Sequence, residues 1–232
     1  MTAAPDARQA ARSGELTLLG QIRSASNATF LCEAELGETR VHCVYKPVAG
    51  EQPLWDFPDG TLADRELAAY LVSEQLGWNI VPYTVIRPGP AGAGMVQLWV
   101  DQPDGEPDLV DLVPVGAVPP GYLPVLQARD YAGAQVALVH ADDPGLFRMA
   151  VFDVLINNAD RKGGHVLRGV DGGVYGVDHG VSLHVHDKLR TVLWGWAGRR
   201  VDEPTLAAVT GLAEALDGPL AEALAGHLTA AE

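Results

Sequence analysis

The stretch that decides the fold is residues 157–180, NNADRKGGHVLRGVDGGVYGVDHG. A helix is expected before it, because Asp143 can cap a helix N-terminus and Pro144 suits the first helical position. Residues 157–165 then end that helix and enter a loop that contains two glycines. The rest of the stretch reads as a hairpin that closes on the Asp-His-Gly triplet.

The hairpin is predicted from its turn. Asp171-Gly172 between two apolar segments is a strong signal for a two-residue β-turn. A turn centred there fixes the register, so that Arg168 faces Tyr175 and His165 faces Asp178. Directly opposed residues have Cβ atoms about 4.5–5.5 Å apart. Two possible metal ligands are therefore expected side by side at the open end of the hairpin.

Three polar side chains converge at that end. Asp160 lies in the loop, His165 follows five residues later, and Asp178 lies opposite. Phosphoryl transfer needs carboxylates that hold Mg²⁺ and one that orients the attacking group. Protein kinases place a catalytic Asp and a metal-binding Asn five residues apart, ahead of an Asp-x-Gly triplet. Arg161 and Lys162 are expected in solvent or in contact with phosphate or acceptor.

The N-terminal half reads as a sheet with one helix. β-Branched and apolar residues mix in five strand-like segments, 15–22, 29–36, 40–46, 81–86 and 95–100. Thr61 begins a capping-box pattern, which predicts a helix to about Leu76 that stops at Gly77. Glu66 lies on the apolar face of this helix, where a carboxylate needs a partner. Lys46, at the end of the third strand, is the partner that we expect.

The C-terminal half reads as mainly helical. Helices are expected at 124–140, 143–157, 204–216 and 219–228. The acidic segment 101–121, rich in Pro and Gly, is the best candidate for a connection between two lobes. We therefore predict an α+β protein with a flexible tail over 1–13, an N-lobe over 14–100, a connection over 101–121 and a C-lobe over 122–232.

With these motifs, the chain resembles the atypical kinases related to phosphatidylinositol 3-/4-kinases and HipA-like kinases. It resembles in particular a conserved family of small actinobacterial proteins described as phosphatidylinositol kinase-related. The matching features span about residues 15–200 and include Lys46, Glu66, Asp160-Arg161 and Asp178-His179-Gly180. The resemblance implies a two-lobed, protein-kinase-like fold with an antiparallel N-lobe sheet and a mainly helical C-lobe.

The resemblance also implies roles for individual residues. Asp160 is the expected catalytic residue, and Asp178 and His165 are the expected metal ligands. The residues expected to contact ATP are Lys46, Glu66, Ser24, Ser26, Asn27, Gln97 and Trp99, the two serines and Asn27 within a phosphate-covering loop at 24–29. The implied cofactors are ATP and Mg²⁺ or Mn²⁺. Mn²⁺ enters because His165 stands where these kinases have Asn, and imidazole suits transition metals better than Mg²⁺.

Charge and composition exclude several classes of binding partner. The 232 residues carry a net charge of −14, which argues against nucleic acid and against an anionic membrane surface. No apolar run approaches the roughly 18 residues of a membrane span, so no integral membrane association is expected. Cys32 and Cys43, without a secretory signal, indicate a reducing, cytoplasmic compartment and two buried thiols. The expected partners are a nucleotide and an unknown phosphate acceptor.

Three functions stay open at this point. The first is an ATP-dependent phosphotransferase acting on a protein or small-molecule hydroxyl. The second is a nucleotide-binding pseudokinase or regulatory module, or a nucleotidyl transferase, because His165 and a phosphate loop without glycine depart from the kinase pattern. The third is a metal-dependent hydrolase that uses Asp160, Asp178, His179, His184 and His186.

Overall fold

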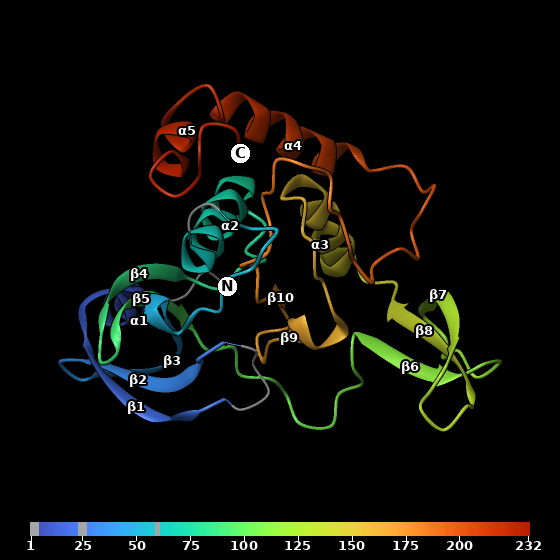
Figure 1. The fold of residues 1–232 in the computed structure, drawn as a ribbon. Coiled ribbons are helices and arrows are strands. Elements are labelled where there is room, and N and C mark those ends of the chain that lie inside the picture. Colours follow the sequence, from blue (N-terminus) through green and yellow to red (C-terminus); the bar gives the residue numbers. More distant parts are fainter. Residues whose placement is uncertain (1–4, 23–26, 59–60) are drawn as a thin grey trace.

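A five-stranded antiparallel sheet forms the N-terminal part of the computed structural model, which describes residues 5–22, 27–58 and 61–232 (Figure 1). In spatial order its strands are β1 (Glu15–Gln21), β2 (Phe30–Leu36), β3 (Thr39–Pro47), β5 (Gly92–Leu98) and β4 (Thr84–Gly89). These are the five strands predicted from the sequence, with small shifts at their ends. Lys46 lies near the end of β3, in the centre of the sheet, and is paired with Met95 of β5.

Helix α1 (Pro5–Ser13) lies against this sheet where the sequence predicted a flexible tail. Ala10 and Ala11 are fully buried, and Ala11 packs in a cluster with Cys32, Cys43 and Tyr45. Small alanine side chains let the helix approach the sheet closely, so the tail prediction is wrong for residues 5–13. Both cysteines are free and buried, as predicted.

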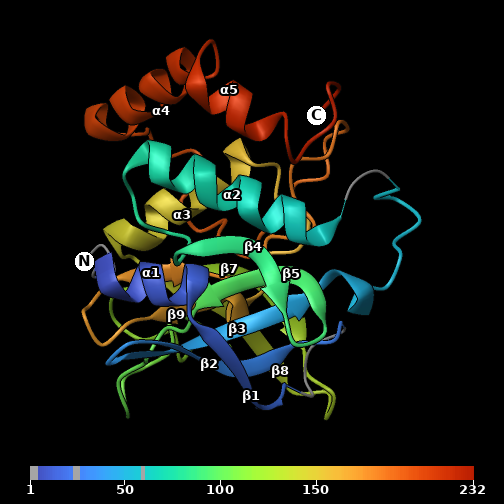
Figure 2. The same ribbon diagram turned by 90° about the vertical axis from the view of Figure 1, so that its left-hand side faces the viewer.

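Helix α2 (Leu62–Leu76) forms as its caps predict. The Thr61 hydroxyl accepts a hydrogen bond from the backbone N–H of Asp64 at 3.0 Å. The helix ends at Gly77, whose φ of 67° needs a residue without a Cβ. Figure 2 shows α2 between the sheet and the helices α4 (Glu203–Ala215) and α5 (Pro219–Leu224). The helix is therefore buried on two sides, and Glu66 faces the interior.

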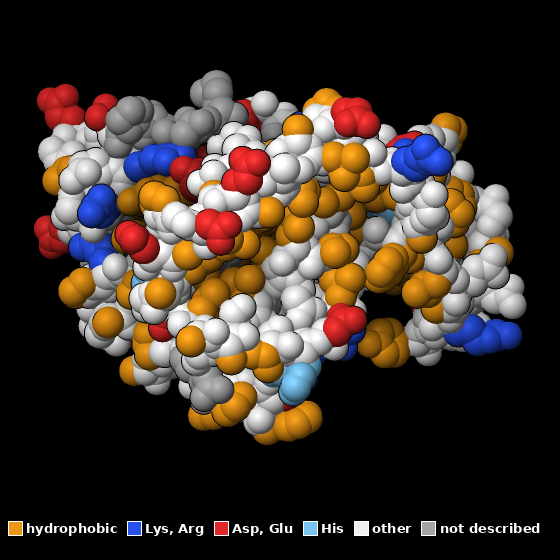
Figure 3. Space-filling view, turned by 90° about the horizontal axis from the view of Figure 1, so that it is seen from above, with side chains coloured by type: hydrophobic (Ala, Val, Ile, Leu, Met, Phe, Trp, Pro, Cys, Tyr) orange, Lys and Arg blue, Asp and Glu red, His pale blue; other side chains and the backbone are white. Residues whose placement is uncertain are grey.

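Helix α3 (Pro144–Leu155) is capped by Asp143, as expected. Leu146, Met149 and Phe152 are fully buried in a core that also contains residues of α2, α4 and α5. No helix among the described residues is long and apolar enough to cross a membrane. Figure 3 looks down on the side of α4 and α5 and shows apolar side chains between scattered charged ones. Leu206 of α4 and Leu216, which follows it, are each nearly half exposed.

A second, three-stranded antiparallel sheet replaces a predicted helix. Its order is β6 (Val110–Pro114), β8 (Gln135–Ala141) and β7 (Tyr122–Arg129), and in Figure 1 it lies across the hairpin from the first sheet. The helix predicted at 124–140 is wrong because Asp130 and Gly133 make a turn in its middle. The Asp130 carboxylate accepts two backbone N–H bonds, and Gly133 has a φ of 83°. The predicted connection is likewise wrong over 110–114, which form a strand.

The predicted hairpin is confirmed, with a register that differs by one residue. Strands β9 (Val166–Arg168) and β10 (Val174–Gly176) pair Arg168 with Val174, not with Tyr175. The turn is wider than two residues, because the N–H of Gly169 bonds the carbonyl of Gly173 at 2.9 Å. The chain is thus mixed α+β, with antiparallel sheets and several helices, and its second half contains more strand than predicted.

The core around α3 gives a first test. Replacement of the fully buried Phe152 by Ala should lower the free energy of unfolding by about 3–5 kcal/mol, because it leaves a cavity. Urea denaturation measures this loss. The matched control is Val154→Ala on the same helix, at a side chain that is 56% exposed, which should change stability by less than about 0.5 kcal/mol. Equal losses in the two variants would contradict the placement of α3.

Candidate functional site

The ammonium group of Lys46 joins the two halves of the chain. Its Nζ donates to Glu66 Oε1 at 2.6 Å and to Asp178 Oδ1 at 2.9 Å. Glu66 comes from α2, and Asp178 follows strand β10. The Lys–Glu pair predicted from the sequence is therefore present, and Asp178 completes a cluster of one cation between two anions.

The opposite charges in this cluster compensate for the free-energy cost of burying them. Burial opposes the charge of Lys46, but the carboxylates of Glu66 and Asp178 outweigh it and raise the pKa of Lys46. Burial likewise opposes the charge of Asp178, and nearby Lys46 outweighs it and lowers the pKa of Asp178. Both groups thus stay ionised at neutral pH, and each depends on the other.

His165 meets Asp178 although the predicted pairing is shifted. The ladder register places Val177 opposite His165, and the N–H of Val177 donates to the His165 carbonyl at 3.1 Å. Asp178 has a φ of 64°, a conformation that L residues rarely adopt, and this turns its carboxylate back toward the hairpin. His165 Nε2 lies 3.3 Å from Asp178 Oδ2. Burial lowers the pKa of His165, so its ring is neutral at pH 7.

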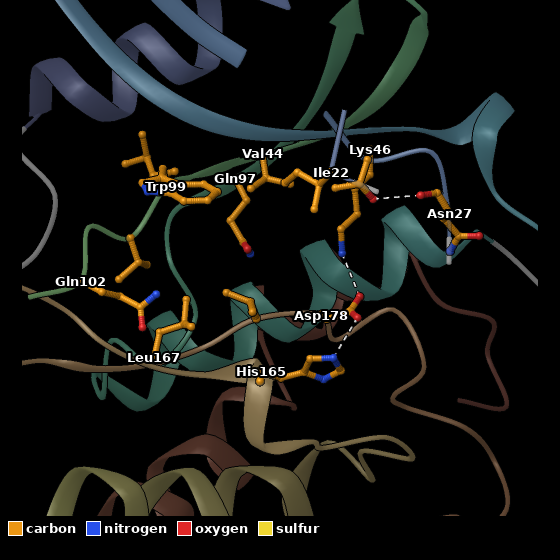
Figure 4. A pocket seen from close by; sticks show the side chains of 15 residues that line it. Ile22, Asn27, Val44, Lys46, Gln97, Trp99, Gln102, His165, Leu167 and Asp178 are labelled. Atoms are coloured by element: carbon orange, nitrogen blue, oxygen red, sulfur yellow. Dashed lines mark hydrogen bonds and ion pairs between the residues drawn. The ribbon is translucent and has the colours of Figure 1, made fainter. Parts of the chain in front are cut away.

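A cavity of about 340 Å³ opens beside Lys46, between the first sheet and the hairpin (Figure 4). We call it the Gln97 cavity. Lys46, Asp178 and His165 lie at one end, and Trp99 lies at the other. Apolar side chains from both sides line the space between them, namely Ile22, Val44, Leu98, Val100, Leu167 and Val177.

The predicted cavity residues are placed as follows. Gln97 is buried, donates to the hydroxyl of Thr84 at 2.9 Å, and lines the cavity together with Trp99, which is 41% exposed. Asn27 lines it too, and its side chain accepts from the N–H of Gln52 at 2.9 Å. Ser24 and Ser26 lie outside the described residues.

Arg161 is buried, where the sequence favoured solvent, phosphate or acceptor. Its guanidinium donates to Asp153 from Nε at 3.1 Å and from Nη2 at 2.9 Å. It also donates to the carbonyls of His165 and Val177. Thr191 and Asn158 complete the hydrogen bonds to Asp153. Arg161 thus connects the loop at 157–165 to α3 and to the hairpin. The sequence alone does not reveal this role, because it depends on contacts between distant residues.

His179 links this network to the Lys46 cluster. Arg161 Nη2 lies 2.7 Å from His179 Nε2, and because guanidinium only donates, Nε2 must accept. Burial and the charge of Arg161 lower the pKa of His179 far below its ordinary value, so the ring is neutral. Its backbone N–H donates to Glu66 Oε2 at 2.9 Å. Glu66 is therefore held from both sides of the cleft.

Asp160 lies on the other side of Asp178. Its carboxylate pairs with Lys162 at 2.7 Å and with Arg190 at 2.5 Å, and its backbone N–H donates to Asn158 Oδ1 at 3.0 Å. It lines a second cavity of about 220 Å³, which we call the Asp160 cavity. The two cavities share Asn27, Lys46 and Asp178, so they meet at the charge cluster.

Comparison with known proteins identifies the family. The chain is 68% identical over 240 residues to protein Rv2133c of Mycobacterium tuberculosis (strain ATCC 25618 / H37Rv), a match that covers 100% of this chain and 86% of that protein. The chain belongs to the Rv2133c family. No family model matches the chain, and no solved structure matches it. The family therefore includes an actinobacterial member, and the name of that protein states no activity.

The histidines of this Rv2133c-family chain do not gather around one point. His184 lies in a loop, with its ring against Phe57 and 5.4 Å from the ring of His186, measured between centroids. His179 is fully buried against Arg161. Within residues 5–22, 27–58 and 61–232, no group of three or more His, Cys, Asp or Glu side chains is arranged to hold a metal ion. This geometry gives the hydrolase hypothesis no support.

The neutral His179 predicts a pH dependence of stability. Below about pH 6.5 the unfolded chain binds a proton at this position that the folded chain does not bind, so the free energy of unfolding falls by up to about 1.4 kcal/mol per pH unit. His179→Gln removes the imidazole that binds this proton in the unfolded chain, and its amide oxygen can still accept a hydrogen bond from Arg161. Urea unfolding between about pH 7.5 and pH 5 should therefore give a flatter curve for His179→Gln. His42→Gln, at an exposed position, is the control; curves of equal slope for native and His179→Gln would refute the assignment.

Proposed function

We propose that the chain is an ATP-dependent phosphotransferase with a two-lobed, protein-kinase-like fold. One observation carries the proposal: Lys46 bonds both Glu66 and Asp178 at the junction of two cavities. A strand Lys paired with a helix Glu, and an Asp that can bind Mg²⁺, are the parts by which kinases hold nucleotide phosphates. Asp160 lies in the cavity beyond this junction.

The Gln97 cavity is the proposed nucleotide site. Its apolar walls suit a flat base, and buried Gln97 and half-exposed Trp99 offer a polar contact and a stacking surface. The charged cluster at its other end suits the phosphates. The first sheet with α2 would form the N-lobe, and the rest of the chain from about residue 101 would form the C-lobe. The reducing cytoplasm would keep Cys32 and Cys43 as thiols.

The residues beside Lys46 fit a divalent cation. Asp178 Oδ2 and His165 Nε2 lie 3.3 Å apart, close enough for both atoms to contact one ion. Mg²⁺ characteristically takes one or two protein ligands and completes its shell with phosphates and waters. Asp178 and His165 would hold the ion, and it would supply charge neutralisation at the transferring phosphate. Lys46 would release Asp178 and bind phosphate oxygens instead.

Asp160 would orient the acceptor hydroxyl and accept its proton. The carboxylate is held in place by Lys162, by Arg190 and by the loop bonds of Asn158. A carboxylate fixed within hydrogen-bond reach of the attacking group is the requirement for such a role. The buried Arg161–Asp153 pair would keep this loop rigid during the reaction.

A nucleotide-binding test addresses the proposal directly. ATP with Mg²⁺ or Mn²⁺ should raise the Tm of the native chain; binding at 100 times Kd adds about 2.7 kcal/mol. Asp178→Ala should lose the part of this shift that depends on the cation, because it removes the main ligand. Leu216→Ala, a half-exposed residue remote from the cavities, is the control. A shift that is equal in native chain and Asp178→Ala would reject Asp178 as a metal ligand.

A catalytic test concerns Asp160. Asp160→Asn should reduce phosphoryl transfer from ATP by about 100-fold or more and keep the nucleotide-induced thermal shift. Transfer is measured with γ-labelled ATP. Undiminished transfer by Asp160→Asn would exclude the proposed role of this carboxylate.

A second candidate function is a nucleotide-binding regulatory module or a nucleotidyl transferase. Asp160 favours it, because both of its carboxylate oxygens already pair with cations and neither is left free for an acceptor hydroxyl. His165 at a metal-ligand position favours it as well. A regulatory module would show the thermal shift without transfer, and a nucleotidyl transferase would add a nucleotide mass to its product in mass spectrometry.

A further inference from the structure

Residues 51–58, which we call the strap, form one wall of the Asp160 cavity. The carboxylate of Glu51 accepts hydrogen bonds from the backbone N–H groups of Leu62 and Ala63 at the start of α2, at 3.0 and 2.9 Å. Further along, Asp56 pairs with Lys188 at 3.2 Å. In Figure 2 the strap continues from the 3₁₀ turn η1 (Val48–Gly50) toward α2. It is therefore attached to parts of the chain on both sides of the cavity.

The C-terminal end of the strap is anchored by an aromatic ring. Phe57 is buried, and its ring lies 5.0 Å from the ring of His184, in an edge-on arrangement, and 5.0 Å from the guanidinium of Arg65. Leu54, three residues earlier, faces the cavity. Phe57 thus fixes this end of the strap, and Leu54 is the apolar side chain that the strap contributes to the cavity lining.

The Asp160 cavity is small. Its volume of about 220 Å³ is below the roughly 300–1,000 Å³ that is usual for ligand pockets. Leu54, Leu62 and Val181 give it an apolar side opposite the charged side that contains Asp160. An extended peptide needs a longer groove along its backbone than a cavity of this volume provides.

The charge of the cavity lining also limits which acceptors can bind. Four carboxylates line the cavity, from Glu51, Glu66, Asp160 and Asp178. Two ammonium groups line it, from Lys46 and Lys162, and Arg190 pairs with Asp160 from outside the lining, which leaves an excess of one negative charge. A bound nucleotide adds more negative charge at the junction. An anionic acceptor would meet like charges at short range, whereas hydroxyl or ammonium groups would donate to the carboxylates.

We infer that the phosphate acceptor is a small alcohol without negative charge, a polyol or an amino alcohol, which binds in the Asp160 cavity. This inference rests on the proposed phosphotransfer function. The apolar side of the cavity contacts the carbon skeleton of the acceptor, and Asp160 accepts its reacting hydroxyl proton. The volume of the cavity disfavours peptides, and the charge of its lining disfavours phosphorylated lipids and other anionic alcohols.

The reaction balances without a further reagent. The acceptor oxygen forms a bond to the γ-phosphorus of ATP while the bond from that phosphorus to the bridging oxygen of ADP breaks. The hydroxyl proton passes to Asp160 and then to water. The products are ADP, the phosphate monoester of the alcohol and one proton.

The test uses the full chain with γ-labelled ATP and three fractions of a bacterial extract. The small molecules are divided by anion exchange into an unretained fraction, which is neutral or cationic, and a retained anionic fraction; the proteins form the third. Label should enter only compounds of the unretained fraction. Label in proteins or in retained compounds would overturn the acceptor assignment and leave the phosphotransferase intact. Nucleotide binding without transfer to any fraction would overturn both proposals.

A cavity-filling variant tests the location. Leu54 lines the Asp160 cavity and not the Gln97 cavity. Leu54→Trp should therefore occupy the Asp160 cavity, so transfer should fall roughly tenfold or more while the nucleotide thermal shift is kept. Leu216→Trp makes the same exchange at a half-exposed leucine on the far helices and should transfer like the native chain. Undiminished transfer by a folded Leu54→Trp, or loss of its nucleotide shift, would place the acceptor elsewhere.

Discussion

The contact between Lys46 and two carboxylates is the interaction on which the site depends. It joins a central strand, a buried helix and the end of a hairpin that are far apart in sequence. A buried carboxylate such as Glu66, which is 2% exposed, is tolerated only when it is paired and hydrogen-bonded. Glu66 meets this condition through Lys46 on one side and the N–H of His179 on the other. The position of α2 therefore follows from charge satisfaction as well as from packing.

A second buried network fixes the opposite wall. Arg161 and Asp153 are both fully enclosed, and removal of either would leave an uncompensated charge in the interior, at a cost of about 3–5 kcal/mol. His179 stands between the two networks as a neutral acceptor for Arg161. Together they form a continuous chain of hydrogen bonds from Lys46 through Glu66 and His179 to Arg161 and Asp153.

Sequence patterns predicted the elements whose signals are local. The Thr61 and Asp143 caps, the Gly77 stop and the hairpin at 166–176 all depend on neighbouring residues, and all are present. The pairing of Lys46 with Glu66 was predictable because an acid on an apolar helix face needs a partner. The second sheet was missed because 124–140 contains good helix formers, and the turn at Asp130 and Gly133 outweighed them. The burial of Arg161 and the strap were not predictable, since both depend on contacts between distant segments.

The ion pair between Lys46 and Asp178 has a thermodynamic consequence for the proposed site. Asp178 cannot bind a cation fully while it neutralises Lys46, and Lys46 cannot bind phosphate fully while Asp178 holds it. In the proposed site, a cation that takes Asp178 would free Lys46, and a phosphate that takes Lys46 would free Asp178. Each ligand would thus remove the competitor of the other, and the proposal therefore implies positive heterotropic cooperativity through a single salt bridge.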